Sequence, residues 1–248
     1  MIIIKNQEQI DGIKKSCKLT SDTMKYIEPF VVAGVTTEKL DSLVHDYIIA
    51  HNAVPATLNY QDYPKSCCIS LNEEICHGIP NETVLKEGDI VKIDIATILN
   101  GYFGDMCKTF AIGNVSLEAR KLMLVTKNAL MNSIELVKPG AFTGDIGAFI
   151  HAFATSLGYG VIKEFCGHGV GIKFHESPQI CHVALKGTGE KMVPGMTFTI
   201  EPMICTKKPE MLILENKWTA VTKDKGLTAQ FEHTILVTKT GHEILTEI

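Results

Sequence analysis

The sequence lacks long apolar runs and blocks of like charge. Its N-terminal apolar run is only Ile2-Ile3-Ile4, whereas a signal peptide needs about 7–15 apolar residues and a membrane span about 18 or more. Lysine and arginine are scattered, and the net charge of -4 argues against a broad basic surface for DNA. We therefore expect a cytoplasmic protein that binds neither DNA nor a membrane.

Cysteine pairs of the C-x-x-C type are also absent, although the chain contains eight cysteines. Their irregular spacing offers no structural zinc motif, and a chain of this length without a secretory signal does not suggest a disulfide framework. The composition, 45% hydrophobic and 21% charged, is that of an ordinary globular protein. We expect reduced thiols in the core or lining a pocket.

Apolar residues at helical spacing predict four helices. The segments are residues 7–30, 37–51, 117–137 and 143–157. Shifted by 106 positions, the second segment aligns with the fourth, so that Gly34 meets Gly140 and His45 meets His151. A strand-rich stretch follows each helix pair. This pattern indicates an internal repeat of helix, helix and strands.

The repeat predicts an α+β fold in which two helix pairs cover one curved antiparallel sheet. The halves are about 1–112 and 113–248, and no linker rich in glycine and serine separates them. We therefore expect one domain with pseudo-two-fold symmetry, spanning residues 1–248.

Two aspartates lie on a predicted hairpin. A strand over residues 90–98 leads to Asn100-Gly101, the strongest short signal for a two-residue hairpin turn. Such a turn makes Asp94 and Asp105 diagonal neighbours on the same face of the sheet, about 7–8 Å apart at the backbone. Their side chains could then reach one cation or a pair of cations.

Two later predicted strands each direct a glutamate away from an apolar face. In residues 196–201 that glutamate is Glu201, and in residues 228–235 it is Glu232. A single acidic residue on a strand is usually only solvated. Four carboxylates on one concave face would repel one another unless a cation neutralised them or their pKa values rose.

Histidines lie near glycines in a predicted loop over residues 166–178. The glycines permit backbone conformations that could carry His168 and His175 into a site. His77, in a turn before the hairpin, could equally be an exposed turn residue. Two aspartates, one histidine and two glutamates suit manganese, iron(II), cobalt(II), zinc or magnesium, and bridging carboxylates suggest two metal ions.

The sequence resembles the type I methionine aminopeptidases, a branch of the pita-bread metallopeptidases. The matching stretches occur in order over nearly the whole chain: Tyr63-Pro64-Lys65-Ser66, Ser70-Leu71-Asn72-Glu73, His77-Gly78-Ile79-Pro80, Asp94-Ile95, Gly104-Asp105, Gly167-His168-Gly169, Phe174-His175-Glu176, Met196 to Met203, and Gln230 to Thr234. The start at Met1, without a zinc-finger extension, is similar to the short bacterial form.

The resemblance implies a role for each matching position. The metal ligands would be Asp94, Asp105, His168, Glu201 and Glu232. The catalytic residues would be His77, His175 and Glu201, with both histidines facing the substrate. The methionine pocket would be formed by Tyr60, Tyr63, Cys68, Phe174 and Trp218. Two departures, Thr57 at the pocket mouth and Ala96 beside the metal site, bear on metal preference and inhibitor sensitivity.

The implied activity is removal of the initiator methionine from nascent proteins whose second residue is small. A water or hydroxide bridging two divalent metal ions (Mn, Fe(II), Co or Zn) would attack the first peptide bond. The family also allows a monovalent cation, and the ribosome stays open as a partner; we expect a monomer. Two alternatives remain: a sister peptidase acting at proline, and a non-catalytic binding protein on the same fold.

Overall fold

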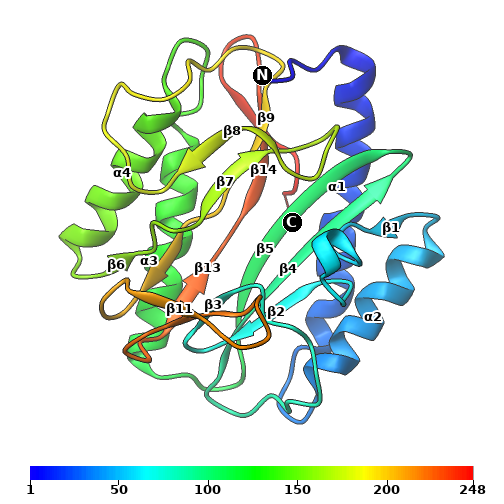
Figure 1. The fold of residues 1–248 in the computed structure, drawn as a ribbon, viewed down its shortest axis with the longest axis vertical. Coiled ribbons are helices and arrows are strands. Elements are labelled where there is room, and N and C mark those ends of the chain that lie inside the picture. The colour runs from blue at the N-terminus through cyan, green and yellow to red at the C-terminus, as the bar shows by residue number, and fades with distance from the viewer. Residues whose placement is uncertain (248) are drawn as a thin grey trace.

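A computed structural model describes residues 1–247, and all four predicted helices are present in it (Figure 1). They are α1 (Gln7–Ile27), α2 (Thr37–Ala50), α3 (Leu117–Ile134) and α4 (Thr143–Ser156). The first was expected to reach residue 30 but ends at Ile27, and a 3₁₀ turn, η1 (Glu28–Phe30), follows it. Pro29 explains the early end, because its ring nitrogen carries no hydrogen and cannot donate to a carbonyl of the preceding helical turn.

Side-chain caps fix where two of the helices begin. The Thr36 hydroxyl accepts a hydrogen bond from the Lys39 amide at 3.1 Å, and the Ser116 hydroxyl accepts one from the Ala119 amide at 3.1 Å. Each satisfies an amide that has no partner within its own helix.

Within residues 1–247 the strands form four antiparallel sheets. Their bounds are β1 (Val54–Pro55), β2 (Cys68–Leu71), β3 (Glu74–Cys76), β4 (Ile90–Leu99), β5 (Tyr102–Ala111), β6 (Gly160–Val161), β7 (Cys166–Gly169), β8 (Glu176–Cys181), β9 (Thr197–Ile200), β10 (Met203–Cys205), β11 (Met211–Ile213), β12 (Ala220–Thr222), β13 (Thr228–Gln230), β14 (His233–Val237) and β15 (His242–Ile244). One sheet has the order β1-β4-β2 with β5 on β4, and another has β15-β14-β9-β7-β8. The three-stranded sheets are β13-β10-β6 and β11-β12-β3. A short 3₁₀ turn, η2 (Tyr60–Asp62), lies between β1 and β2.

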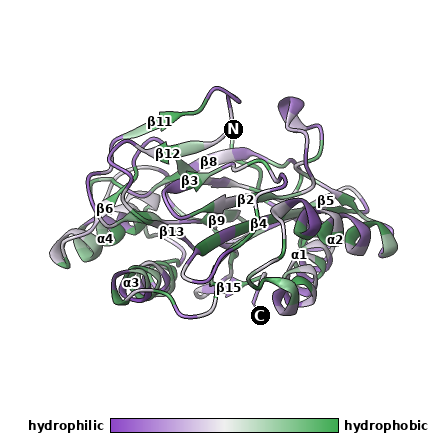
Figure 2. Ribbon diagram, turned by 90° about the horizontal axis from the view of Figure 1, so that it is seen from below, coloured by the Kyte–Doolittle hydropathy of each residue, from purple (hydrophilic) through white to green (hydrophobic). Residues whose placement is uncertain are grey.

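The helix pairs flank the strands. Figure 1 shows α1 and α2 on one side of the strands and α3 and α4 on the other. In Figure 2, α1 and α3 lie at the lower side of the molecule with β15 between them, and β11 and β12 lie at the upper side. One buried apolar cluster joins α1 and α2 to β4 and β5, and a second joins α3 and α4 to β9 and β14. This is the expected α+β arrangement with two helix pairs.

The two halves also contact each other directly. Strand β3 pairs with β12, and the ammonium of Lys92, which is 1% exposed, donates to the backbone and hydroxyl oxygens of Thr228 at 3.0 and 2.9 Å. These contacts favour one domain; that grouping, with a division near residue 112, stays a prediction. Within residues 1–247, none of the helices is both long and apolar enough to cross a membrane.

Candidate active site

All twelve residues assigned from the sequence line one pocket of about 600 Å³. They are Tyr60, Tyr63, Cys68, His77, Asp94, Asp105, His168, Phe174, His175, Glu201, Trp218 and Glu232. Thr57 also lines the pocket, and Ala96 lies directly opposite Asp105 in the β4–β5 hairpin. The chain therefore brings together residues that are widely separated in the sequence.

The β4–β5 hairpin positions the two aspartates as predicted. Leu99 pairs with Tyr102 across Asn100-Gly101, and Ala96 pairs with Asp105. Asn100 and Gly101 both have positive φ, at 52° and 81°, as a two-residue turn of this kind requires. The register confirms the predicted diagonal relation of Asp94 and Asp105.

The His168 imidazole lies close to the carboxylates of Asp105 and Glu201. The His168 Nδ1–H donates to the carbonyl of Gly169 at 3.0 Å, which leaves Nε2 as an acceptor. Nε2 lies 3.6 Å from the Asp105 carboxylate and 3.7 Å from that of Glu201. Ligand atoms of Asp105, His168 and Glu232 all lie within 4.8 Å of one another. An imidazole whose other nitrogen is held by a backbone carbonyl is the usual metal-binding arrangement.

The protonation equilibria of the cluster also fit a site that binds cations. Burial raises the pKa of Asp94 to about 7 and that of Glu201 to about 8, and repulsion between carboxylates adds to the rise at Glu201. Burial likewise raises the pKa of Asp105 and Glu232 well above the usual range. Burial lowers the pKa of His168 to about 3, so its imidazole is neutral at pH 7. Bound divalent cations would reverse these shifts by stabilising the ionised carboxylates.

The prediction of one continuous strand over 228–235 is wrong. The strand breaks into β13 and β14, and Glu232 lies at the break, where its amide donates to the Cys107 carbonyl at 2.9 Å. Glu201 lies at the matching break between β9 and β10, because Ile200 pairs with His233 and Met203 pairs with Gln230. The paired interruptions place both glutamates, which are 8% and 2% exposed, in the pocket.

The predicted loop over 166–178 is largely a hairpin, formed by β7 and β8. A Cβ atom on Gly167 would lie 2.3 Å from the Thr199 carbonyl, and one on Gly169 would lie 2.3 Å from that of Ser177. These two glycines therefore serve close strand packing. In the connection after β7, Gly171 has a positive φ of 132°.

Two further histidines line the pocket from connecting segments, His77 directly after β3 and His175 between β7 and β8. Nδ1 of His175 lies 2.9 Å from the Tyr60 hydroxyl, and the His175 ring centroid lies 4.1 Å from that of His168. His77 has the left-handed backbone conformation, with φ at 55°. Such a conformation costs a non-glycine residue about 1–3 kcal/mol and persists only where its surroundings hold it. Burial lowers the pKa of His77 to about 4.

Aromatic rings and a thiol line the rest of the pocket. Tyr63 and Trp218 meet edge to face with centroids 5.1 Å apart, and Tyr60 and Phe174 do so at 4.9 Å. The Tyr63 hydroxyl donates to the Gly78 carbonyl at 2.8 Å. This hydrogen bond joins the aromatic wall to the turn that carries His77.

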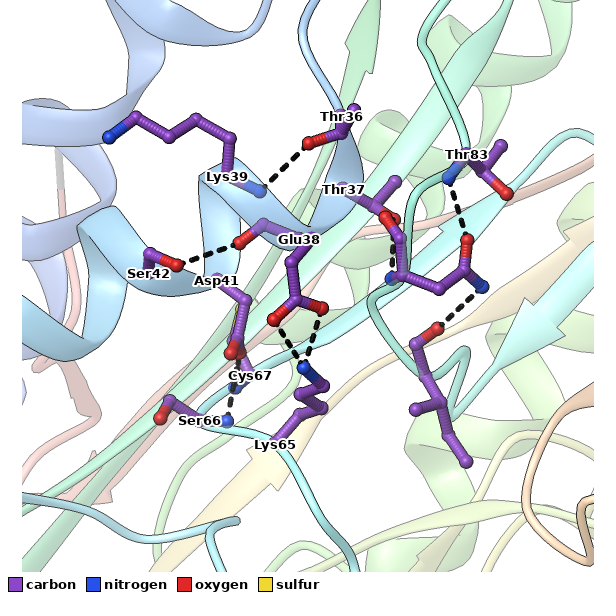
Figure 3. Close-up of polar contacts among 12 residues, drawn as sticks. Thr36, Thr37, Glu38, Lys39, Asp41, Ser42, Lys65, Ser66, Cys67 and Thr83 are labelled. Atoms are coloured by element: carbon purple, nitrogen blue, oxygen red, sulfur yellow. Dashed lines mark hydrogen bonds and ion pairs between the residues drawn. The ribbon is translucent and has the colours of Figure 1, made fainter.

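Several residues that support the site were not singled out from the sequence. Asp41 on α2 is 7% exposed, and its carboxylate accepts from the amides of Ser66 and Cys67 at 2.8 and 3.1 Å (Figure 3). Lys65 forms an ion pair with Glu38 on the same helix (Figure 3). Together they hold the segment that leads into Cys68.

The side chains that donate hydrogen bonds to Glu201 were also not predicted from the sequence. Thr199 donates to one oxygen of Glu201 at 2.8 Å, and the Gln230 amide donates to the other at 3.3 Å. Both partners lie inside motif stretches that had been matched, which was the only signal for them in the sequence.

Residues 11–239 match the profile of metallopeptidase family M24. The chain belongs to this family. It is 44% identical to methionine aminopeptidase of Escherichia coli K12 over 247 residues, which are 99% of this chain and 94% of that protein. The crystal structure of methionine aminopeptidase from Rickettsia prowazekii superposes with a TM-score of 0.98 at 44% identity and full coverage of both chains.

The family relation confirms the pita-bread fold and a metallopeptidase that uses divalent metal. A prolidase from Pyrococcus horikoshii has the same fold, with a TM-score of 0.79 over all of this chain and 64% of that one. Its 21% identity carries the likeness no further than the fold. The roles of individual site residues remain predictions.

Proposed function

We propose that this member of metallopeptidase family M24 is a methionine aminopeptidase that removes the N-terminal methionine when the second residue is small. The observation that carries the proposal is that one pocket contains both the cluster of His168 with the carboxylates and a wall of aromatic rings that includes the Cys68 thiol. The likeness to methionine aminopeptidases over nearly the whole chain supports it.

The residues that would hold metal are Asp94, Asp105, His168, Glu201 and Glu232. Four ionised carboxylates carry four negative charges, which two divalent cations would balance, and the residues that line the pocket within the described chain include no lysine or arginine. Bound divalent cations would polarise the peptide carbonyl and lower the pKa of the attacking water. We propose manganese, iron(II), cobalt or zinc as the ion, with two ions bound.

The chain's own residues would orient the peptide and move its protons. A Tyr60 hydroxyl that donates to Nδ1 of His175 leaves the Nε2–H free to donate to the carbonyl oxygen as negative charge develops. Glu201 would accept a proton from water and deliver it to the leaving nitrogen, and the hydrogen bonds from Thr199 and Gln230 hold its carboxylate in place. His77 would bind at the scissile nitrogen.

The aromatic wall suits a methionine side chain. A thioether sulfur gains about 0.3–1.5 kcal/mol from contact with an aromatic ring. Tyr60, Tyr63, Phe174 and Trp218 would provide such rings, and the Cys68 thiol would supply a soft partner. This pocket would select the first residue of the substrate.

The test is hydrolysis of a Met-Ala-Ser peptide by the His175→Ala variant. Loss of one oxyanion donor typically costs about 10²–10³ in kcat, and we expect that loss with unchanged metal content and unfolding midpoint. His151→Ala, at an exposed position on α4, is the control and should retain full turnover. Near-normal kcat in His175→Ala would remove the assigned role.

Two observations would favour the alternatives. Cleavage of Xaa-Pro but not Met-Ala peptides would favour a sister peptidase, and stoichiometric metal without any hydrolysis would favour a binding protein. Titration of the metal-stripped chain with manganese, cobalt, iron(II) and zinc during the same assay would identify the ion that supports turnover. We further propose that the chain acts in the cytoplasm as a monomer on nascent polypeptides; sedimentation with ribosomes would test the last point.

A further inference from the structure

Two cysteines face each other across the β7–β8 hairpin, at the edge of the pocket. Cys166 and Cys181 are direct partners in the strand register. Of the eight cysteines, all within the described residues, six are buried, whereas Cys166 is partly buried and Cys181 is exposed. The two thiols most open to solvent are therefore opposite one another.

The hydrogen bonding identifies the kind of strand pair that they form. The amides of His168 and Val170 donate toward β9, to the Thr199 hydroxyl at 3.0 Å and the Thr197 carbonyl at 3.2 Å. Because backbone groups alternate along a strand, those of Cys166 also point toward β9 and away from β8. Cys166 and Cys181 therefore form a non-hydrogen-bonded pair.

The partner strand agrees. A Cβ atom on Gly147 of α4 would lie 2.1 Å from the Cys181 carbonyl, so this carbonyl points toward α4 and away from β7. Non-hydrogen-bonded pairs have Cα atoms about 4.5 Å apart and the closer side chains. Disulfides span Cα separations of about 4.4–6.8 Å, so the pair can close with little backbone movement.

Both thiols lie on the open face of the hairpin. Along β8, Ser177, Gln179 and Cys181 are exposed while Pro178 and Ile180 are buried. Cys166 lines the pocket, as do His168 beside it and Gln179 opposite His168. The Cys68 thiol also lines the pocket but is buried. An oxidant that reaches Cys181 would thus act next to the accessible pocket thiol.

We propose that Cys166 and Cys181 form a reversible disulfide, a redox modification site at the rim of the pocket. The Cys181 thiolate attacks one sulfur of oxidised glutathione, which forms a mixed disulfide and releases one glutathione thiolate. The Cys166 thiolate then attacks the Cys181 sulfur, forms the bridge and releases the second glutathione. Two cysteine thiols are oxidised, one glutathione disulfide is reduced, and the two protons pass to the released thiolates.

The bridge would enclose the hairpin segment that carries both His168 and His175. The disulfide is a modification separate from the proposed peptidase activity, and it is detected by alkylation and mass spectrometry without an activity assay. Failure of the disulfide would leave the proposed activity standing, and failure of the activity would not remove the disulfide.

The experiment treats the full chain with oxidised glutathione, alkylates the remaining thiols after unfolding, and maps the peptides by mass spectrometry without reduction. In the wild type we expect two of the eight cysteines to escape alkylation, a linked peptide joining residues 166 and 181, and complete reversal by dithiothreitol. Cys166→Ser should instead keep a glutathione adduct at Cys181. Cys181→Ser, at an exposed position outside the pocket, should keep Cys166 free to alkylation.

Three results would overturn the proposal. The first is a lasting glutathione adduct on Cys181 of the wild type. The second is full alkylation of both cysteines after treatment, and the third is a link between any other pair.

Discussion

Lys5 and Glu176 form a buried ion pair beside the pocket, and its removal gives a sharp prediction. The ammonium lies 3.1 Å from one carboxylate oxygen, and the two side chains are 1% and 3% exposed. That oxygen also accepts from the Ile172 amide at 3.1 Å, and the Lys5 amide donates to the Gly195 carbonyl. Glu176 directly follows His175, so the pair joins the N-terminal segment to the hairpin of the site.

Lys5→Met should destabilise the protein by about 3–5 kcal/mol, because it leaves a buried carboxylate without a counter-charge. At this separation and an effective dielectric constant of about 20, the Coulomb attraction is about 5 kcal/mol, which is the same scale. Burial outweighs the attraction of Glu176 and lowers the pKa of Lys5. The pair as a whole is therefore not strongly stabilising, and Lys5→Met/Glu176→Gln should recover most of the loss.

The assay is urea unfolding of the single and double variants, with kcat and KM for Met-Ala-Ser measured alongside. We expect the single variant to lower kcat more than it raises KM, because the carboxylate next to His175 loses its anchor. Lys14→Met is the matched control: Lys14 pairs with Glu243 at 2.7 Å, but these side chains are 39% and 45% exposed, so its loss should cost under about 1 kcal/mol. Equal destabilisation in the single and double variants would refute the coupling.

Three further perturbations test other parts of the molecule. Asp41→Ala should cost about 1–3 kcal/mol and raise KM for methionyl peptides, since two buried amides lose their acceptor, whereas Asp41→Asn should retain most of both; equal KM in all three proteins would contradict this. Burial lowers the pKa of His182 to about 3, from 6.5 when unfolded, so the unfolded chain binds the proton first and stability falls as pH drops below about 6.5. Replacement by leucine should remove about 1.4 kcal/mol per pH unit from that slope in urea titrations at pH 4–6, and an unchanged slope would contradict it. Chelation of divalent metal should abolish turnover and lower the unfolding midpoint, and ions at about 100 times Kd should restore roughly 2.7 kcal/mol; scanning calorimetry of both forms would show no difference if the cluster binds no metal.

Local patterns were sufficient for the helices and for one hairpin. The starts of α2 and α3 are set by Thr36 and Ser116, whose hydroxyls cap amides three residues ahead, an interaction set entirely by neighbours in the chain. The β4–β5 register followed from Asn100-Gly101 for the same reason. Because a two-residue turn fixes every pairing behind it, Asp94 and Asp105 could be placed relative to one another before the fold was known.

Strand breaks and strand packing could not be obtained in this way. Alternation through Phe231 and Glu232 is locally compatible with one strand, and it is the bond from the Glu232 amide to the Cys107 carbonyl of β5 that competes with continued pairing. The glycines of β7 have a similar origin. These glycines are needed because β9 and β8 pack closely against β7, and not because of a local turn. Strand β9 lies far along the chain, and β8 follows only after the chain reverses direction.

The supporting residues of the site are the hardest to foresee, and the reason is physical. Lys5 and Asp41 are partners of groups that only the folded chain brings near them. Lys5 pairs with the carboxylate of Glu176, and Asp41 accepts from two amides just before β2. Neither residue differs in type or spacing from the many lysines and aspartates that remain solvated, so no local pattern separates them. Burial separates them, because a charged side chain persists in the interior only with a partner. Lys5 is 1% exposed and Asp41 is 7% exposed. Those partners lie next to His175 and just before Cys68, so the groups that maintain the pocket also join α2 and the N-terminal segment to it.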